Sequence, residues 1–418
     1  MPIPVVDLFA GPGGLNEGFS AAVGKKGERI FKTAISVEFE KCAHRTLELR
    51  ALYRHLKNAG KLNDYYRYVR GDITREQLFE SAKEIGVAAQ KEALLATLGK
   101  SEAEDEKIEQ KIKEALAEFK DSEFVLIGGP PCQAYSLAGR SRRAKEKREK
   151  FESDHKHVLY REYLRIVAKF RPALFVMENV TGLLSASLKG RHTFQQIQDD
   201  LRSAGYDLHP ITPEVSDEAG PEDPRAYIVR AEEYGVPQCR ARVFILGLRS
   251  DLGLVPQSLS RPEAPKVTVD DVIRDLPEIR SRLSKEPDYP DTWRSAIQQL
   301  LQYEFKSLDK NVHLGMLSNL NEMPLERPLG AQVLKPTRKK PKGLADWFAD
   351  PNLGVVLNHG SRGHMRSDLM RYFFWSQYAQ SKGRSPTLSE VPHFLRPKHK
   401  NISGNAKEAP FADRFRVQ

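Results

Sequence analysis

One pattern repeats through the first 250 residues: a short apolar run ends in a polar or glycine-rich turn, and a stretch with helical periodicity follows. The apolar runs are residues 5–9, 32–38, 124–127, 173–177 and 243–248. Strands that alternate with helices indicate a parallel α/β sheet, because two parallel neighbours need a crossover connection between them. Ligands of such sheets bind beyond the carboxyl ends of the strands. The polar residues that follow each run are therefore the candidate site residues.

The alternation ends near residue 250, and residues 251–418 are instead rich in proline, turns, basic and aromatic side chains. We therefore predict two domains, 1–250 and 251–418. Within the first, residues 75–120 are dense in glutamate and lysine and carry apolar residues at helical spacing. This predicts one or two amphipathic helices inserted between two sheet strands. We expect the insertion to be a solvated excursion without a catalytic role.

The positive charge of the chain is concentrated at its end. Residues 331–418 hold 16 Lys and Arg but 6 Asp and Glu, a surplus of 10 that equals the net charge of all 418 residues. A basic region beside a neutral one favours a module that binds a polyanion such as nucleic acid. A basic tail that serves only solubility is the alternative.

Composition excludes several classes of protein. With 40% apolar and 29% charged residues, the chain is not disordered. No run approaches the ~20 apolar residues of a membrane span, so we expect no membrane partner. Met1 leads directly into the first apolar run, so we expect no signal peptide. Three cysteines without a CxxC pair predict a reducing, intracellular setting and no metal site.

The first run ends in a glycine-rich turn with the sequence Gly11-Pro12-Gly13-Gly14. Glycines let the backbone approach a ligand closely, and a following helix offers unpaired N–H groups. The dinucleotide fingerprint is absent, because Asn16 stands where its third glycine would be. A purely structural tight turn is the alternative.

Two acids follow the next runs. Glu38 closes the second run and can accept both hydroxyls of a ribose. Asp72 follows residues 68–71, which we predict to be the third strand, and can accept an exocyclic amine. Taken alone, each carboxylate is explained as readily by a solvent-exposed acidic residue without a ligand. Together with the glycine turn they outline an adenosine pocket.

Two segments carry reactive side chains. Cys132 follows a strand in a proline-stiffened loop with arginines behind it. An electropositive setting favours the nucleophilic thiolate, although a lone cysteine is more often a small buried residue. Glu178 follows the next apolar run, where its pKa can be raised so that it acts as an acid. The structural alternative for this segment is a helix cap, formed by Asn179.

The last run is preceded by three polar residues at a spacing of two: Gln238, Arg240 and Arg242. Alternate residues of a strand point the same way, so these side chains need a shared partner. A base edge, a phosphate or a protein carboxylate would serve.

Four segments resemble, in order and spacing, the signature segments of the cytosine-5 DNA methyltransferase family. They are DLFAGPGGLNEGF from residue 7, GGPPCQAYS from 128, ENV from 178 and QCRAR from 238. The resemblance covers about residues 4–250. It implies a Rossmann-like fold of the S-adenosylmethionine-dependent methyltransferases, a mostly parallel sheet flanked by helices. It also implies that 1–250 is the catalytic domain and that 251–418 is a smaller, irregular target-recognition domain.

The resemblance implies a site-specific DNA cytosine-5 methyltransferase of a restriction-modification system. In this family the thiolate, here Cys132, adds to C6 of a cytosine flipped out of the duplex. Glu178 would protonate or hydrogen-bond N3, and C5 would take a methyl group from S-adenosylmethionine, leaving S-adenosylhomocysteine. Arg240 and Arg242 would hold the cytosine, and Asn179 would support Glu178.

The resemblance also implies the binding residues, and no metal. The implied cofactor contacts are Phe9, Gly11, Gly13, Gly14, Leu15, Glu38, Phe39, Asp72, Ile73 and Pro131. The implied DNA contacts are Gln133, Ser136, Arg140, Gln238, Arg362, His364, Arg366 and Arg371. Residues 140–150 match the mobile loop that closes over the flipped base, or form a solvated charge run.

Family members continue past the recognition region into a segment that completes the cofactor pocket, and we expect this chain to lack it. A second polypeptide that supplies the segment is therefore one expected partner, beside double-stranded DNA and a cognate restriction endonuclease. We expect a bacterial cytoplasmic, nucleoid-associated enzyme. The alternatives are a non-catalytic or split-enzyme DNA-binding subunit and a tRNA cytosine-5 methyltransferase. The large basic region argues against the latter.

Overall fold

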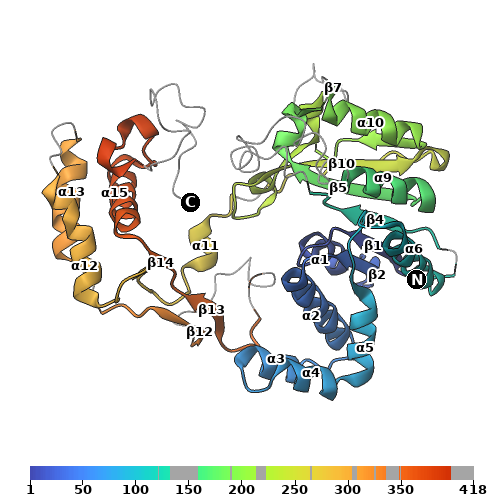
Figure 1. Cartoon of the computed structure of the whole chain (residues 1–418), viewed down its shortest axis with the longest axis horizontal. Coiled ribbons are helices and arrows are strands. Elements are labelled where there is room, and N and C mark those ends of the chain that lie inside the picture. Colours follow the sequence, from blue (N-terminus) through green and yellow to red (C-terminus); the bar gives the residue numbers. More distant parts are fainter. Residues whose placement is uncertain are drawn as a thin grey trace. The chain divides into compact units, whose positions relative to one another are not determined.

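The computed structural model describes residues 1–120, 122–131, 159–188, 191–212, 223–263, 266–303, 308–323, 326–335, 348 and 350–396. The chain forms two compact units, Met1–Val272 and Ile273–Gln418, coloured along the sequence in Figure 1. The first unit runs past the boundary predicted near 250. A backbone hydrogen bond from Leu259 N to Ile211 O (2.7 Å) and an ion pair between Arg261 and Glu233 (3.0 Å) hold this extension.

The first unit is built on one eight-stranded sheet with the order β3-β2-β1-β4-β5-β10-β8, in which β9 also pairs with β10. The strands are β1 Ile3–Leu8, β2 Phe31–Glu38, β3 Ala93–Leu95, β4 Val125–Gly128, β5 Leu174–Val180, β8 Tyr206–His209, β9 Ile228–Arg230 and β10 Ala241–Arg249. From β3 to β5 all neighbours are parallel, whereas β10 is antiparallel to β5, β8 and β9. The mostly parallel sheet confirms the predicted fold class.

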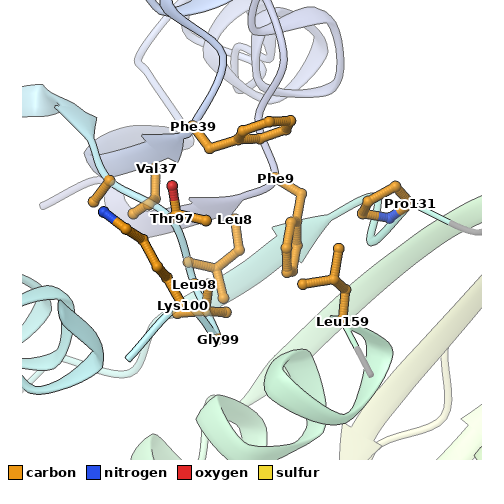
Figure 2. Close-up of a pocket in the computed structure, with 11 residues that line it drawn as sticks. Leu8, Phe9, Val37, Phe39, Thr97, Leu98, Gly99, Lys100, Pro131 and Leu159 are labelled. Atoms are coloured by element: carbon orange, nitrogen blue, oxygen red, sulfur yellow. The ribbon is translucent and has the colours of Figure 1, made fainter. Parts of the chain in front are cut away.

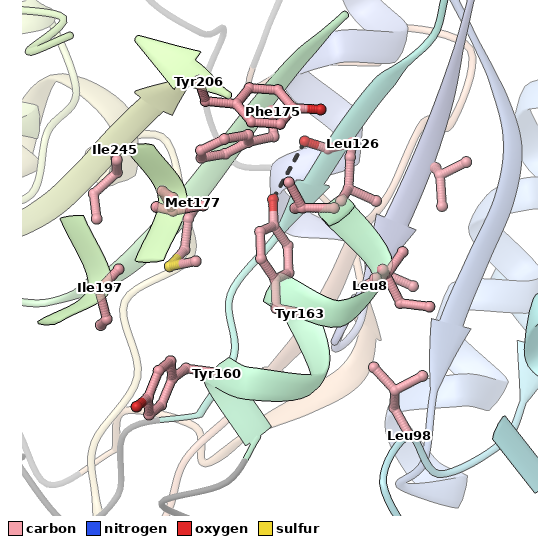
Figure 3. Packing of buried hydrophobic residues seen from close by; sticks show 14 of the residues in the cluster. Leu8, Leu98, Leu126, Tyr160, Tyr163, Phe175, Met177, Ile197, Tyr206 and Ile245 are labelled. Carbon is pink, nitrogen blue, oxygen red and sulfur yellow. Dashed lines mark hydrogen bonds between the residues drawn. The ribbon is translucent and has the colours of Figure 1, made fainter. Parts of the chain in front are cut away.

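Helices cover both faces of this sheet (Figure 1). They are α1 Gly14–Ala21, α2 Lys41–Asn58, α5 Lys83–Glu92, α6 Glu102–Ala117, α9 Leu159–Phe170 and α10 Thr193–Ser203. Two further helices, α3 Asn63–Arg70 and α4 Arg75–Ser81, pack with α2 and α5 in a separate apolar cluster that contains no strand residue. Alternate residues of β1 face opposite layers, because successive side chains of a strand point to opposite faces. Leu8 packs with α6, α9 and α10, and Val5 packs with residues of α1. Figure 3 shows the buried cluster to which Leu8 belongs. There the buried Tyr163 hydroxyl donates a hydrogen bond to Leu126 O (3.4 Å).

The prediction of a third strand at residues 68–71 is wrong. Those residues end α3, and Gly71 terminates the helix in the left-handed conformation (φ 87°). Tyr65 and Tyr68 lie three residues apart and pack against the same apolar cluster, which is helical rather than strand-like spacing. The third strand is β3, which lies inside the predicted insertion and forms the edge of the sheet. The insertion is helical as expected, but it contains three helices, α4, α5 and α6, where one or two were predicted. Ile108 and Ile112 of α6 are fully buried in the core of the unit, so the insertion is not the solvated excursion that its composition suggested.

The second unit is smaller and less regular. Its strands form two-stranded pairs, β12 Gly330–Leu334 with β13 Val356–Gly360 and β11 Arg282–Leu283 with β14 Gly363–His364. Its core lies among the helices α12 Pro290–Gln298, α13 Lys310–Asn321 and α15 Arg366–Lys382. Phe374 and Trp375 of α15 are buried there.

Shorter elements complete the described part of the chain. They are α11 Val269–Ile273, the strand pair β6 Ser187–Leu188 and β7 Arg191–His192, and 3-10 turns at Thr181–Ser185, Pro224–Tyr227, Ala231–Tyr234, Ser250–Leu252, Gln299–Gln302, Leu388–Glu390 and His393–Leu395. Among the residues described, no helix is long and apolar enough to cross a membrane.

Candidate active site

The glycine-rich turn carries the chain from the end of β1 into α1. Phe9 and Gly11 both adopt positive φ (55° and 56°), and Ala10 N donates to Val37 O of β2 (3.1 Å). Gly13 precedes α1 at φ 89°, and a Cβ there would lie 2.9 Å from Leu47 Cδ1. Only glycine fits this position without strain, because L residues disfavour positive φ and the neighbouring side chain leaves no room.

Asn16 fastens α1 to the sheet. Its side chain is fully buried, accepts a hydrogen bond from the Thr33 hydroxyl (2.9 Å) and donates to Ser36 Oγ (3.3 Å). Both partners lie on β2. The residue that breaks the dinucleotide fingerprint is therefore a structural link between helix and strand, which the sequence pattern did not reveal.

Glu38 ends β2 beneath the glycine turn and is 5% exposed. One carboxylate oxygen accepts Gly11 N and the other accepts Glu40 N, both at 2.7 Å. The carboxylate thus holds the turn against the sheet. Because each oxygen has two acceptor sites, capacity remains for a ligand hydroxyl.

A cavity of about 280 Å³ lies next to this turn (Figure 2). Its lining residues are Leu8, Phe9, Val37, Phe39, Ala96, Thr97, Leu98, Gly99, Lys100, Pro131 and Leu159. The structure thus brings together the predicted contacts Phe9, Phe39 and Pro131. Two aromatic rings in a mostly apolar cavity suit a flat ring system such as a purine. Gly11, Gly13, Gly14 and Leu15 lie in the adjacent turn and helix rather than in the lining.

The structure does not bring Asp72 and Ile73 to this cavity. Asp72 follows α3, is exposed and donates its backbone N–H to Arg67 O (2.8 Å). Ile73 packs with the cluster around Leu52 and Leu78. The wrong strand assignment explains the difference: the residues that follow the true third strand are 96–100. The sequence signal for them, the run Ala93-Leu94-Leu95, is short and lies in the charged insertion.

A second group of predicted site residues contains an ion pair between Glu178 and Arg242. They lie on the neighbouring strands β5 and β10, and Arg242 Nε is 2.9 Å from Glu178 Oε1. Burial raises the pKa of Glu178, while the positive charges of Arg242 and Arg240 act against that rise. The carboxyl group is therefore protonated at higher pH than a free glutamate would be, as the predicted acid requires.

Asn179 links β5 to the proline turn that follows β4. Its Nδ2 donates to Pro130 O (3.0 Å), and its Oδ1 accepts Val180 N (2.9 Å). A Cβ on Gly129 would lie 3.2 Å from Glu178 Oε2, so the turn passes close to the carboxylate. The turn leads to Cys132, which lies outside the described residues. Gln133, Ser136, Arg140 and the loop 140–150 lie outside them as well.

Arg240 and Gln238 precede β10 rather than lying on it, and both are exposed. Arg240 N donates to Glu232 Oε2 (3.0 Å). Of the three residues predicted to share one face of a strand, Arg242 alone therefore lies on β10. Arg240 acts on Glu178 through its positive charge.

Residues 84–331 match the profile of the family described as C-5 cytosine-specific DNA methylase. The chain belongs to this family. A Type II methyltransferase, M.Bpa9945I of Bacillus paralicheniformis, is 30% identical over 327 residues, 74% of this chain and 68% of the relative. A DNA-cytosine methyltransferase of Escherichia coli K12 is 29% identical over 336 residues, 79% of this chain and 59% of the relative. A solved DNMT2 mutant of Spodoptera frugiperda is 11% identical, with a TM-score of 0.39 over 94% of this chain and 92% of that one.

In the second unit of this cytosine-5 methylase, the four predicted DNA contacts differ in their surroundings. Arg366 pairs with both carboxylate oxygens of Glu286 (2.6–3.1 Å), and Arg371 donates to Leu395 O (2.7 Å) and to Asp368. Both arginines therefore hold the unit together.

Arg362 is exposed, and its guanidinium has no partner among the described residues. The ring of His364 lies edge-on to that of Tyr372, 5.1 Å between centroids. Of the four candidates, these two have side chains without a hydrogen bond or ion pair to the residues that the structure describes. Within the described residues, no group of three His, Cys, Asp or Glu is placed to hold a metal ion.

Proposed function

We propose that this chain is a site-specific DNA cytosine-5 methyltransferase that takes its methyl group from S-adenosylmethionine. The observation that carries the proposal is the Glu178–Arg242 pair beside the proline turn that leads to Cys132. These are the polar groups that addition of a thiolate to a cytosine ring requires. The aromatic cavity and the Glu38 carboxylate on the same sheet supply a place for the purine and the ribose of the cofactor.

In the proposed mechanism the Cys132 thiolate forms a bond to C6 of the cytosine. Glu178, whose pKa is raised by burial, donates a proton to N3, and the electron pair of the C5–C6 bond becomes available at C5. The cofactor, when bound, supplies an electrophilic methyl group to which C5 bonds. A base then removes the C5 proton, the C5–C6 double bond re-forms as Cys132 is expelled as thiolate, and N3 returns its proton to Glu178.

Arg242 has two roles in the proposed mechanism. Its guanidinium orients the Glu178 carboxyl and, as a fixed cation, limits how far the pKa of that group rises. Asn179 positions the turn before Cys132 by its bond to Pro130 O. These groups act on a cytosine only when it leaves the base stack, so the proposal includes base flipping.

The basic residues 251–418 would bind duplex DNA and read the target sequence. Cations contact phosphates, whereas a few side chains read base edges. Two of the relatives named above are bacterial, and one is a Type II methyltransferase. We propose the same setting here: a bacterial cytoplasmic enzyme on the chromosome, with a cognate restriction endonuclease as its functional partner.

The test uses the purified chain, S-adenosylmethionine and mixed-sequence duplex DNA, read by bisulfite sequencing. We expect protected cytosines at one recurring sequence, and none with Cys132→Ser. Protection that survives in Cys132→Ser contradicts the proposed nucleophile. Protection that appears only after a second polypeptide is added supports the split-enzyme alternative, and protection of tRNA instead of DNA supports the RNA alternative.

A further inference from the structure

A short link, Ser361 and Arg362, joins two strands of the second unit that belong to different small sheets. The strand β13 ends at Gly360 and pairs with β12, whereas β14 begins at Gly363 and pairs with β11. Ser361 is buried and Arg362 is exposed. A Cβ on Gly363 would lie 3.2 Å from Leu283 O, so the chain passes close against β11 here. The link is therefore tied to both sheets and presents one long side chain, that of Arg362.

Hydrogen bonds fix the backbone of this link. Ser361 N donates to Leu329 O (2.8 Å), and Arg282 N donates to Arg362 O (3.2 Å). The Arg282 guanidinium also donates to Ser361 O, from Nε (3.2 Å) and from Nη2 (2.9 Å). The backbone that carries Arg362 is thus held by both neighbouring segments and by one side chain. Order of this kind lowers the entropy that binding would otherwise cost.

The guanidinium of Arg362 differs from those of the other arginines in this unit. Every other arginine that the structure describes there takes part in a hydrogen bond, an ion pair or another electrostatic interaction. The Arg362 guanidinium has no such interaction with the described residues. A guanidinium carries five N–H donors in a planar fork. On a fixed backbone, these donors are available to a ligand that comes from outside the unit.

Duplex DNA offers two kinds of acceptor to an arginine, the phosphate oxygens and the edges of the bases. A phosphate contact needs positive charge but little geometric precision, so a flexible lysine serves as well. A guanine instead presents N7 and O6 side by side in the major groove, and the planar fork of arginine matches both atoms at once. Such a bidentate contact needs the fork to be held in one place. The anchored backbone around Arg362 therefore favours a base contact.

We propose that residues 360–363 form a base-reading loop in which the Arg362 guanidinium donates two hydrogen bonds to N7 and O6 of one guanine of the target duplex. Arg282 is a positioning residue, because it holds Ser361 O and acts on the base through Arg362. The target sequence then contains a guanine whose identity is read at this loop. The inference rests on the proposed function, and it adds the base and the side chain that reads it.

The test is the selection of duplexes from a random-sequence library by the full chain, read by sequencing, which does not depend on methyl transfer. We expect the wild-type chain to enrich a sequence with guanine at one invariant position. Arg362→Ala should lose about tenfold or more of the preference for guanine at that position and keep the preferences at the others. Arg362→Lys keeps the positive charge but has no planar fork, so it should lose the same preference.

The positioning residue is tested by a double-mutant comparison. Arg282→Gln removes the guanidinium that holds the link, so the preference for guanine should weaken at the same position. The double variant with Arg362→Ala should lose no more of that preference than Arg362→Ala alone, because Arg282 acts through Arg362. Arg384→Ala is the matched control: this arginine is exposed, pairs with Glu390 (2.6 Å) and should keep the full preference. A loss of fold would weaken binding to every sequence and lower the thermal midpoint, which is measured on each variant.

Three results overturn the inference. In the first, Arg362→Ala weakens binding to all duplexes alike and lowers the salt dependence of binding by about one released ion, while Arg362→Lys restores both, as a phosphate contact would. In the second, Arg362→Ala keeps the preference for guanine. In the third, the wild-type chain enriches no sequence. Bisulfite sequencing of DNA treated with the wild-type chain separates the two proposals: methylation at one recurring sequence beside any of these results leaves the proposed function standing, and its absence removes both.

Discussion

The two units of this protein use their polar side chains differently. In the first unit, the Glu38 carboxylate and the neutral Asn179 amide are buried near the ends of sheet strands, and each bonds the backbone of a turn that borders the site. In the second unit, ion pairs join segments to one another, as Arg366 joins α15 to Glu286. Ion pairs also join segments in the first unit, as Arg165 of α9 does with Glu109 of α6, but there polar side chains shape the candidate site as well.

This difference changes how the basic surplus of the recognition region is understood. Net charge counts every arginine equally, but an arginine that forms two hydrogen bonds to a carboxylate is already satisfied. Arg280, 7% exposed, pairs with Asp288 at 3.0 and 3.2 Å. Fewer cations are free for DNA than the sequence count suggests.

The largest expected effect concerns the site of the first unit. Glu178→Gln keeps the size of the side chain but removes the acidic proton, so we expect methyl transfer to fall by ~10²-fold or more. Transfer of radiolabelled methyl groups to duplex DNA measures the rate. Glu118→Gln, on an exposed residue at the end of α6, is the matched control. An unchanged rate in Glu178→Gln would remove the acid from the mechanism.

In the second unit, the largest effect is expected on stability. Arg280→Ala leaves the mostly buried Asp288 carboxylate without its cation and with the Leu283 N–H as its hydrogen-bond donor, which costs ~3 kcal/mol in the free energy of unfolding. All three tryptophans of the chain lie beyond residue 272, so tryptophan fluorescence during urea unfolding reports on this unit. Loss of less than ~1 kcal/mol would show that the ion pair is not structural.

A smaller effect separates a free arginine from a paired one. Arg362→Ala should weaken binding of the target duplex about tenfold and leave the unfolding midpoint unchanged. Arg366→Ala should instead lower stability by up to about 1 kcal/mol, because its partner Glu286 is partly exposed. Fluorescence anisotropy with labelled duplex gives the affinities. The reverse pattern would show that Arg366 leaves Glu286 to contact DNA.

The smallest effect is a shift in pH dependence. In the proposed mechanism Glu178 acts as an acid, so methyl transfer should decline as pH rises through its raised pKa. Arg242 lowers that pKa by its charge, and Arg242→Gln should therefore move the decline to higher pH, besides slowing the reaction. Single-turnover rates across the pH range test this. A shift to lower pH would contradict the assigned cause.

Much of the first unit could be predicted from the sequence. Each apolar run that ends in a polar turn marks a strand end, and parallel strands bring their ends to one edge of a sheet. Glu38, Glu178 and Asn179 were singled out in this way, since the signal for each lies within a few residues of its own strand. The family resemblance supplied their roles and pointed to Phe9. Both the resemblance and the local pattern pointed to Asp72, which follows a predicted strand that does not exist.

Local sequence was enough to locate the sheet strands with long apolar runs, the residues at their ends and the family to which the chain belongs. Three features emerge only in the folded chain: the three-residue strand β3 forms the sheet edge, residues 96–100 line the cavity, and Arg366 pairs with Glu286, 80 positions away. The cause is the distance along the chain over which each feature is encoded. A strand end is encoded by neighbours in the chain, whereas a cavity wall or an ion pair depends on which distant segments pack together.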